Sequence, residues 1–230
     1  MKLKSLLVLL PLVIVACNRS AEGELPSPTM ISDELLTITD MPNSWDETQR
    51  QVFDVRGNEN PSIDPSIWCP EAYEVTKNLV DLAGESGADV EMNASMPDNR
   101  ARMMRLQAWA NDDVKAYYRD AKEAVRICDG VTTTDDSGVK TTSTLIDGRD
   151  IGDESISWLQ IQTPPMAPGE GKPNSISRTT IARFGSIIMV LQMGDASYDE
   201  EAVAMDEDDW WSIVEDASKK LDSLDSRVHK

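Results

Sequence analysis

Histidine is almost absent from this chain, and that absence removes several kinds of active site. The one histidine is His229, second from the C-terminus, where chain ends commonly fray. Ser-His-Asp catalysis, Cys-His catalysis and ordinary zinc sites all need a histidine held in a fixed geometry. The sequence also lacks a GxSxG nucleophile elbow and a phosphate-binding P-loop. We therefore expect no catalytic residues, no metal site and no cofactor.

Basic residues are scarce. The chain has 22 Lys and Arg against 41 Asp and Glu, so its formal net charge is −19. Nucleic acids and anionic lipid headgroups are bound mainly by clusters of Lys and Arg. We therefore expect no nucleic-acid binding and no direct adsorption to anionic headgroups. An acidic surface suits a cationic partner or loosely bound divalent cations, or it simply keeps the protein soluble.

The N-terminus has the pattern of a bacterial lipoprotein signal. Two lysines precede an apolar run over residues 6–15, which is too short to span a bilayer. The run ends in Val15-Ala16-Cys17, which resembles a lipobox, where the cysteine is acylated and becomes the new N-terminus. We predict a signal peptide over residues 1–16, a lipid anchor on Cys17 at the extracytoplasmic face of the cell membrane, and a flexible tether over residues 17–29. The alternative is a secreted protein cleaved after Ala16.

Two further cysteines, Cys69 and Cys128, complete the total of three. An even pair in an oxidising compartment predicts one disulfide, and the chain has no CxxC redox motif. Closing a loop of this length stabilises a fold by about 4 kcal/mol in the chain-entropy model. Residues 30–230 are enough for one domain with a real core, so we predict a single domain.

Hydrophobic periodicity predicts an α+β fold. Helical spacing is expected over residues 70–83, 114–128 and 207–226, after a short helical turn at 31–36. A disulfide would therefore join the start of one helix to the end of the next. Strand patterns fall at residues 49–55, 90–94, 102–109, 139–146, 154–162, 177–183 and 187–192. We predict an antiparallel sheet of about five to six strands packed against helices.

Five short segments, spread over most of the chain, form a recognisable pattern. They are Leu35-Leu36-Thr37 to Met41-Pro42, Cys69 before a helix, residues 116–128 ending the next helix, Gly152-Asp153-Glu154 before a strand, and Arg183-Phe184-Gly185 in a hairpin. The pattern resembles the PknH-like sensor domain of actinobacterial surface lipoproteins and of some receptor Ser/Thr kinases. The resemblance implies an antiparallel sheet backed by helices and small-ligand sensing, without catalytic residues to carry over. Members often have two disulfides, whereas this chain has cysteines for one.

Aromatic side chains are the candidates for a ligand pocket, because they supply apolar contact area. Those selected are Tyr117, Tyr118, Trp158 and Trp211. The competing interpretation is that they are core residues, which we favour for Trp210. Adjacent Trp210 and Trp211 cannot face the same direction on a helix, so one of them is expected at a groove or at the surface.

The densest acidic cluster lies before and within the last predicted helix. It consists of Asp199, Glu200, Glu201, Asp206, Glu207, Asp208 and Asp209. Oxygen-rich clusters can hold calcium, but the spacing lacks the EF-hand pattern. We favour a helix cap at Asp206, with the following acids complementing the helix dipole.

Three functions are compatible with these features. The first is a non-enzymatic, membrane-anchored lipoprotein that binds or senses a small molecule or a cell-envelope component. The second is an interaction or assembly lipoprotein whose acidic surface docks a basic protein. The third is a carboxylate-based hydrolase, for which 41 acids offer too many pairs to choose among.

Overall fold

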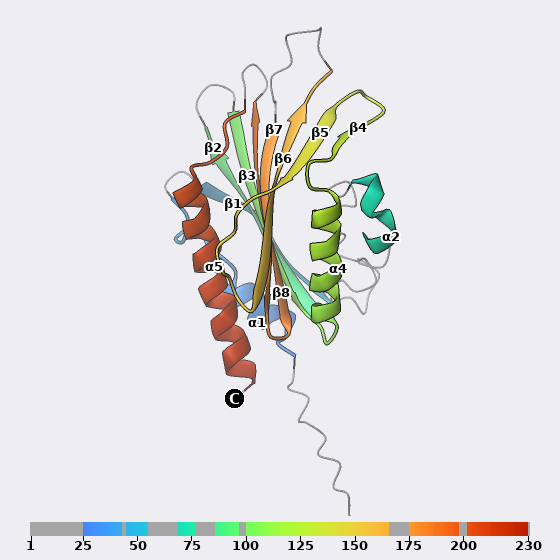
Figure 1. Cartoon of the computed structure of the whole chain (residues 1–230). Coiled ribbons are helices and arrows are strands. Elements are labelled where there is room, and N and C mark those ends of the chain that lie inside the picture. The colour runs from blue at the N-terminus through green and yellow to red at the C-terminus, as the bar shows by residue number, and fades with distance from the viewer. Residues whose placement is uncertain are drawn as a thin grey trace, which may run out of the picture.

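An eight-stranded antiparallel sheet forms the centre of the structure, with helices on both of its faces (Figure 1). The structure is a computed structural model that describes residues 25–42, 45–54, 69–76, 86–96, 100–165, 175–197 and 202–229. Cys17 and the predicted signal peptide lie outside these ranges. The α+β class and the antiparallel pairing are confirmed, but the predicted number of strands is wrong.

The strands follow one another in two meanders that meet in the middle of the sheet. They are β1 (Trp45–Asp54), β2 (Ser86–Ser95), β3 (Arg100–Ala110), β4 (Thr132–Thr134), β5 (Lys140–Leu145), β6 (Glu154–Thr163), β7 (Ser175–Phe184) and β8 (Ile187–Ser197). Their order in the sheet is β1-β2-β3-β8-β7-β6-β5-β4. The last strand, β8, therefore lies between β3 and β7, and Trp109 of β3 pairs with Ile188.

The difference in strand number has a simple cause. All seven predicted strand segments overlap strands of this one sheet, and β4 is an eighth. The three residues of β4 are all threonine, so no apolar residue alternates with a polar one to mark a strand. Pairing with β5, rather than a pattern of its own, makes this edge segment extended.

The helices begin and end close to the predicted positions. They are α1 (Pro28–Glu34), α2 (Tyr73–Thr76) with a 3-10 turn, η2 (Pro70–Ala72), before it, α4 (Val114–Ile127) and α5 (Glu207–Val228). The predicted helix at 70–83 is described only as far as residue 76. As expected, Asp206 caps α5, since its Oδ1 accepts hydrogen bonds from the backbone N–H groups of Asp208 and Asp209 at 2.9 and 3.4 Å. Within the described ranges, none of the helices combines the length and apolar character of a membrane span.

Side chains alternate across each strand, so the sheet has an apolar layer on both faces. On one face, Met104, Leu106 and Ala108 of β3 pack in a cluster with α1 and α5. On the other face, Trp109 and Ile188 share a second cluster with the buried residues of α4. Figure 1 shows α4 and α5 on opposite faces of the sheet. Each face of the sheet can therefore carry its own site.

The predicted disulfide between Cys69 and Cys128 is present, with Cα atoms 5.5 Å apart. Cys69 immediately precedes η2, and Cys128 follows the last turn of α4. Both cysteines are buried beside Ala72 and Ala124. The bond therefore fixes α2 against the outer side of α4.

Candidate functional site

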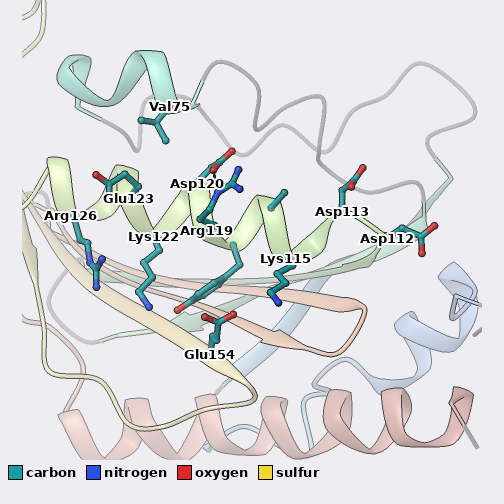
Figure 2. Close-up of a pocket in the computed structure, with 12 residues that line it drawn as sticks. Val75, Asp112, Asp113, Lys115, Arg119, Asp120, Lys122, Glu123, Arg126 and Glu154 are labelled. Carbon is teal, nitrogen blue, oxygen red and sulfur yellow. Dashed lines mark hydrogen bonds and ion pairs between the residues drawn. The ribbon is translucent and has the colours of Figure 1, made fainter. Parts of the chain in front are cut away.

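A cavity of about 880 Å³ runs along the outer side of α4 (Figure 2). Most of its lining comes from α4, and the rest comes from Val75 of α2, Glu154 at the start of β6, and Asp112 and Asp113 before the helix. The disulfide holds α2 beside α4, so Val75 becomes part of this wall.

Four basic residues form a row along α4. Lys115, Arg119, Lys122 and Arg126 recur at spacings of four, three and four residues, which places them on one side of a helix. Figure 2 shows Lys115, Lys122 and Arg126 pointing the same way, toward Glu154. Arg119 turns instead to Asp120, with 2.7 Å between its Nε and Oδ1. We call Lys115, Lys122 and Arg126 the α4 cation row.

These three cations differ from most others in the described part of the chain. Most basic side chains there contact a carboxylate: Arg50 with Glu47, Arg102 with Asp195, Arg105 with Asp89, Arg149 with Glu215, Arg183 with Asp153, Lys219 with Asp216, Lys220 with Asp40, and Arg227 with Glu34. Among the described residues, Lys115, Lys122 and Arg126 have no such ion pair. In a chain with 41 acids, three neighbouring cations without an ion pair among the described residues make this side of α4 a candidate anion site.

Tyr118 lies beside this row. The Nζ of Lys122 is 5.5 Å from the centroid of the Tyr118 ring, a cation–π distance. Burial, with a smaller contribution from the charge of Glu154, raises the pKa of Tyr118 to about 12. The phenol therefore stays neutral at physiological pH. Val75 and Ala116 give the cavity an apolar wall beside the cations, whereas the Tyr118 ring is almost fully buried.

The other side of the cavity is acidic. Asp120 and Glu123 of α4 point away from the cation row and toward α2 (Figure 2). The side of the cavity near β6 therefore has three cations and one acid, Glu154, which is paired with Arg183 at 3.2 Å, and the side near α2 has acids. A bound anion would be directed to the β6 side, because the acids repel it from the other.

The aromatic residues selected from the sequence occupy both faces of the sheet. Tyr117, Tyr118 and Trp158 share the buried cluster between α4 and the sheet, where Tyr117 packs edge-on against Trp109 at 5.2 Å between ring centroids. Trp211 lies on the opposite face with Trp210, and both are buried. The structure thus brings three of the four together and separates Trp211 from them. Of the four, only Tyr118 lines the α4 cavity.

The α4 cation row was missed at the sequence level, although its signal was present. The spacing of Lys115, Lys122 and Arg126 can be read directly along the predicted helix. The low total of basic residues hid it, because net charge says nothing about where the few cations gather. Of the acidic cluster near α5, residues 199–201 lie outside the described residues.

Comparisons with known proteins give a likeness at the level of fold. No protein-family model matches the chain, and no curated protein sequence matches it. The structure is similar to the crystal structure of the extracellular domain of PknH from Mycobacterium tuberculosis, with a TM-score of 0.52 and 10% sequence identity. The match covers 86% of this chain and 98% of that domain. The likeness agrees with the fold that the five sequence segments implied.

Proposed function

We propose that this chain is a lipid-anchored extracytoplasmic protein that binds an anionic small molecule or envelope component along α4, in a sensing or carrier role without catalysis. The observation that carries the proposal is the α4 cation row, three cations without a counterion beside an apolar wall. The lipoprotein signal pattern, the disulfide and the fold likeness to an extracellular domain support the location.

The ligand should combine an anionic group with an apolar part. Exposed ion pairs contribute roughly 0.2–1 kcal/mol each, so three contacts with the cation row give about 1–3 kcal/mol. Micromolar affinity requires about 8 kcal/mol, so an anion alone binds weakly. Contact with Val75 and Ala116 must supply the remainder through apolar burial. A phosphate or carboxylate attached to a short hydrocarbon chain has this chemistry.

A matched pair of probes tests the anion site. Hexyl phosphate and hexanol differ in the charged group, and their binding can be measured by isothermal titration calorimetry. We expect hexyl phosphate to bind and hexanol to bind far more weakly, with an affinity for the phosphate that falls as salt is added. The double variant Lys122→Gln/Arg126→Gln should weaken hexyl phosphate binding by roughly two- to thirtyfold.

Lys140 provides the control, because it is an exposed lysine of β5 outside the α4 cavity. Lys140→Gln removes one positive charge, where the double variant removes two, and should leave hexyl phosphate binding unchanged. An equal loss of binding free energy per charge removed in the double variant and in Lys140→Gln would mean that net charge, and not the α4 groove, attracts the probe.

The membrane anchor is tested separately at Cys17. Cys17→Ala removes the acylated sulfur, so the protein should move from the membrane fraction to the soluble fraction after cell lysis and sedimentation. Continued sedimentation of the variant with membranes would contradict the lipid anchor while leaving the ligand site untouched.

A further inference from the structure

A second cavity lies on the opposite face of the sheet from α4. Its volume is about 290 Å³, and it is enclosed by the first turn of α5 together with β6, β7 and the loop after β5. Its inner lining includes Leu159, Arg178, Trp210 and Trp211, and Asp147 and Glu207 also line it. We call it the α5 cavity.

Arg178 is the unusual member of this lining. It lies on β7, where it pairs with Leu159 of β6 and Met193 of β8, and its side chain is partly buried. Its Nη1 is buried and makes no hydrogen bond, and within the described part of the chain the side chain has no ion pair. A buried guanidinium nitrogen without an acceptor is unfavourable, because burial removes its hydrogen bonds to water and no protein acceptor replaces them.

Arg102 provides a contrast within the same protein. It is also well shielded from solvent, with its side chain 13% exposed, but its Nε contacts Asp195 at 2.5 Å. Among the described residues, Arg102 thus has a carboxylate partner and Arg178 has none. Because the chain has 41 acids, the missing partner is not explained by a shortage of carboxylates.

Trp210 adds a second donor without an acceptor. It is fully buried, and its indole Nε1 makes no hydrogen bond in the described structure. Both Arg178 and Trp210 line the α5 cavity. Arginine binds carboxylates through paired N–H groups, and an indole N–H can donate to the same type of acceptor.

The cavity also has two carboxylates, both on exposed residues, and they favour a ligand with a positive group. Asp147 and Glu207 are both exposed, and Glu207 Oε1 accepts a hydrogen bond from Trp211 Nε1 at 3.3 Å. Neither residue forms an ion pair with Arg178. Two acids at the exposed side repel a ligand that carries only negative charge and attract an ammonium group.

From these features we propose that the α5 cavity binds a small apolar amino acid. The ligand carboxylate pairs with the partly buried side chain of Arg178, which must shift to present Nη1, and the ligand ammonium group lies near Glu207 and Asp147. The ligand side chain packs against Ile146 and Leu159, the two partly buried apolar residues of the lining, above the buried tryptophans. This site lies on the other face of the sheet from the α4 cavity and does not depend on it.

Leucine and two relatives that lack one charge each test the proposal. 4-Methylpentanoate is leucine without its amine, and 3-methylbutylamine is leucine without its carboxylate. Binding of L- and D-leucine and of both relatives to the mature protein can be compared by saturation-transfer NMR. We expect at least one leucine enantiomer to bind, the acid to bind about tenfold more weakly, and the amine not to bind.

Variants then separate the two ends of the ligand. Arg178→Gln should abolish binding of leucine and of 4-methylpentanoate, whereas the control Lys140→Gln should bind both as the unmodified protein does. Glu207→Gln should weaken leucine binding and should not weaken 4-methylpentanoate binding, which gains from the loss of a repelling charge. This comparison keeps the test valid even where Arg178→Gln fails to fold.

Four outcomes overturn the proposal. They are no binding of either leucine enantiomer at millimolar concentration, binding of the amine as tight as that of leucine, unchanged binding in a folded Arg178→Gln protein, and equal affinity for leucine and 4-methylpentanoate. None of these results affects the test with hexyl phosphate, because that probe is assigned to the opposite face of the sheet.

Discussion

The guanidinium of Arg183 lies 2.8 Å from the carboxylate of Asp153, measured from Nη1 to Oδ2. The same Oδ2 accepts a hydrogen bond from the backbone N–H of Gly185 at 2.9 Å, and the Asp153 N–H donates to the Arg183 carbonyl at 2.8 Å. Two of the short segments noticed in the sequence therefore meet at one end of β6 and β7. The contacts between the two segments explain why Asp153, Arg183 and Gly185 occupy these positions.

Gly185 should not tolerate a side chain. Its φ is +52°, and a Cβ there would lie 2.3 Å from Oδ2 and 2.5 Å from Oδ1 of Asp225, and this Oδ1 accepts a hydrogen bond from the Ser186 N–H. Gly185→Ala should lower the free energy of unfolding by about 2–4 kcal/mol, from backbone strain and displacement of Asp225. Gly130 is the matched control, because its φ is +73° but a Cβ there meets no atom within 4 Å. Gly130→Ala should cost about 1 kcal/mol. Equal losses in urea unfolding would contradict the steric argument.

The disulfide should make a large contribution to stability. Cys69 and Cys128 are 59 residues apart in sequence, so breaking their bond frees a long loop in the unfolded chain. The double variant Cys69→Ala/Cys128→Ala should lose about 4 kcal/mol of unfolding free energy in urea titrations. Dithiothreitol should destabilise the unmodified protein by a similar amount and have no effect on the variant. An effect of the reductant on the variant would point to another cause.

The stability of the fold should depend on Arg105, because Arg105 pairs with the buried carboxylate of Asp89. Asp89 is fully buried, and its Oδ2 accepts hydrogen bonds from Arg105 at 2.8 Å and from Gln51 at 3.1 Å. Arg105→Ala leaves this carboxylate without a cation and should cost about 3 kcal/mol, reduced somewhat because Arg105 is 39% exposed. Lys219→Ala removes an exposed pair with Asp216 and should cost under about 0.5 kcal/mol. Thermal unfolding of both variants compares them directly, and a similar shift in the two would refute the role of burial.

Acid should weaken the contact between Asp40 and α5. Burial acts to raise the pKa of Asp40, but hydrogen bonds from Lys220 and Thr37 outweigh it and hold that pKa below its usual value. A carboxyl whose pKa is lowered by folding stabilises the fold at pH values above its unfolded-state pKa of about 4. This contribution is lost as the pH falls through the folded-state pKa. Lys220→Met should therefore lower the melting temperature at neutral pH and have little effect in strong acid. A difference that stays constant with pH would exclude this linkage.

The parts of the fold that were predicted correctly are those with local signals. The apolar spacing of α4 and α5, the Asp206 cap and the cysteine pair can each be recognised within a short stretch of sequence. The beginning of β2 could not be recognised, because Gly87 and Asp89 are poor strand residues. They are extended because β1 and β3 pair with them on either side. The pairing of β3 with β8 likewise depends on residues far apart in the chain.

The candidate sites were harder to predict, for a different reason. Aromatic residues were selected because they can line a pocket, but a sequence does not say which of them the core requires, and Tyr117 and Trp158 are buried there. The feature that distinguishes Lys122 or Arg178 is the lack of a carboxylate partner among the described residues. That property exists only in three dimensions, because a cation lacks a partner only after the chain has placed every acid elsewhere.

The position of β8 also bears on how the chain can cross a membrane. β8 is the last strand to leave a translocation channel that passes the N-terminus first, and it fills the gap between β3 and β7. The central pairs join residues as distant as Arg100 and Ser197, so the sheet cannot be completed until almost all of the chain has emerged. Such long-range pairing slows folding. For the exported chain proposed here, the complete sheet can therefore form only late in export, after β8 has emerged.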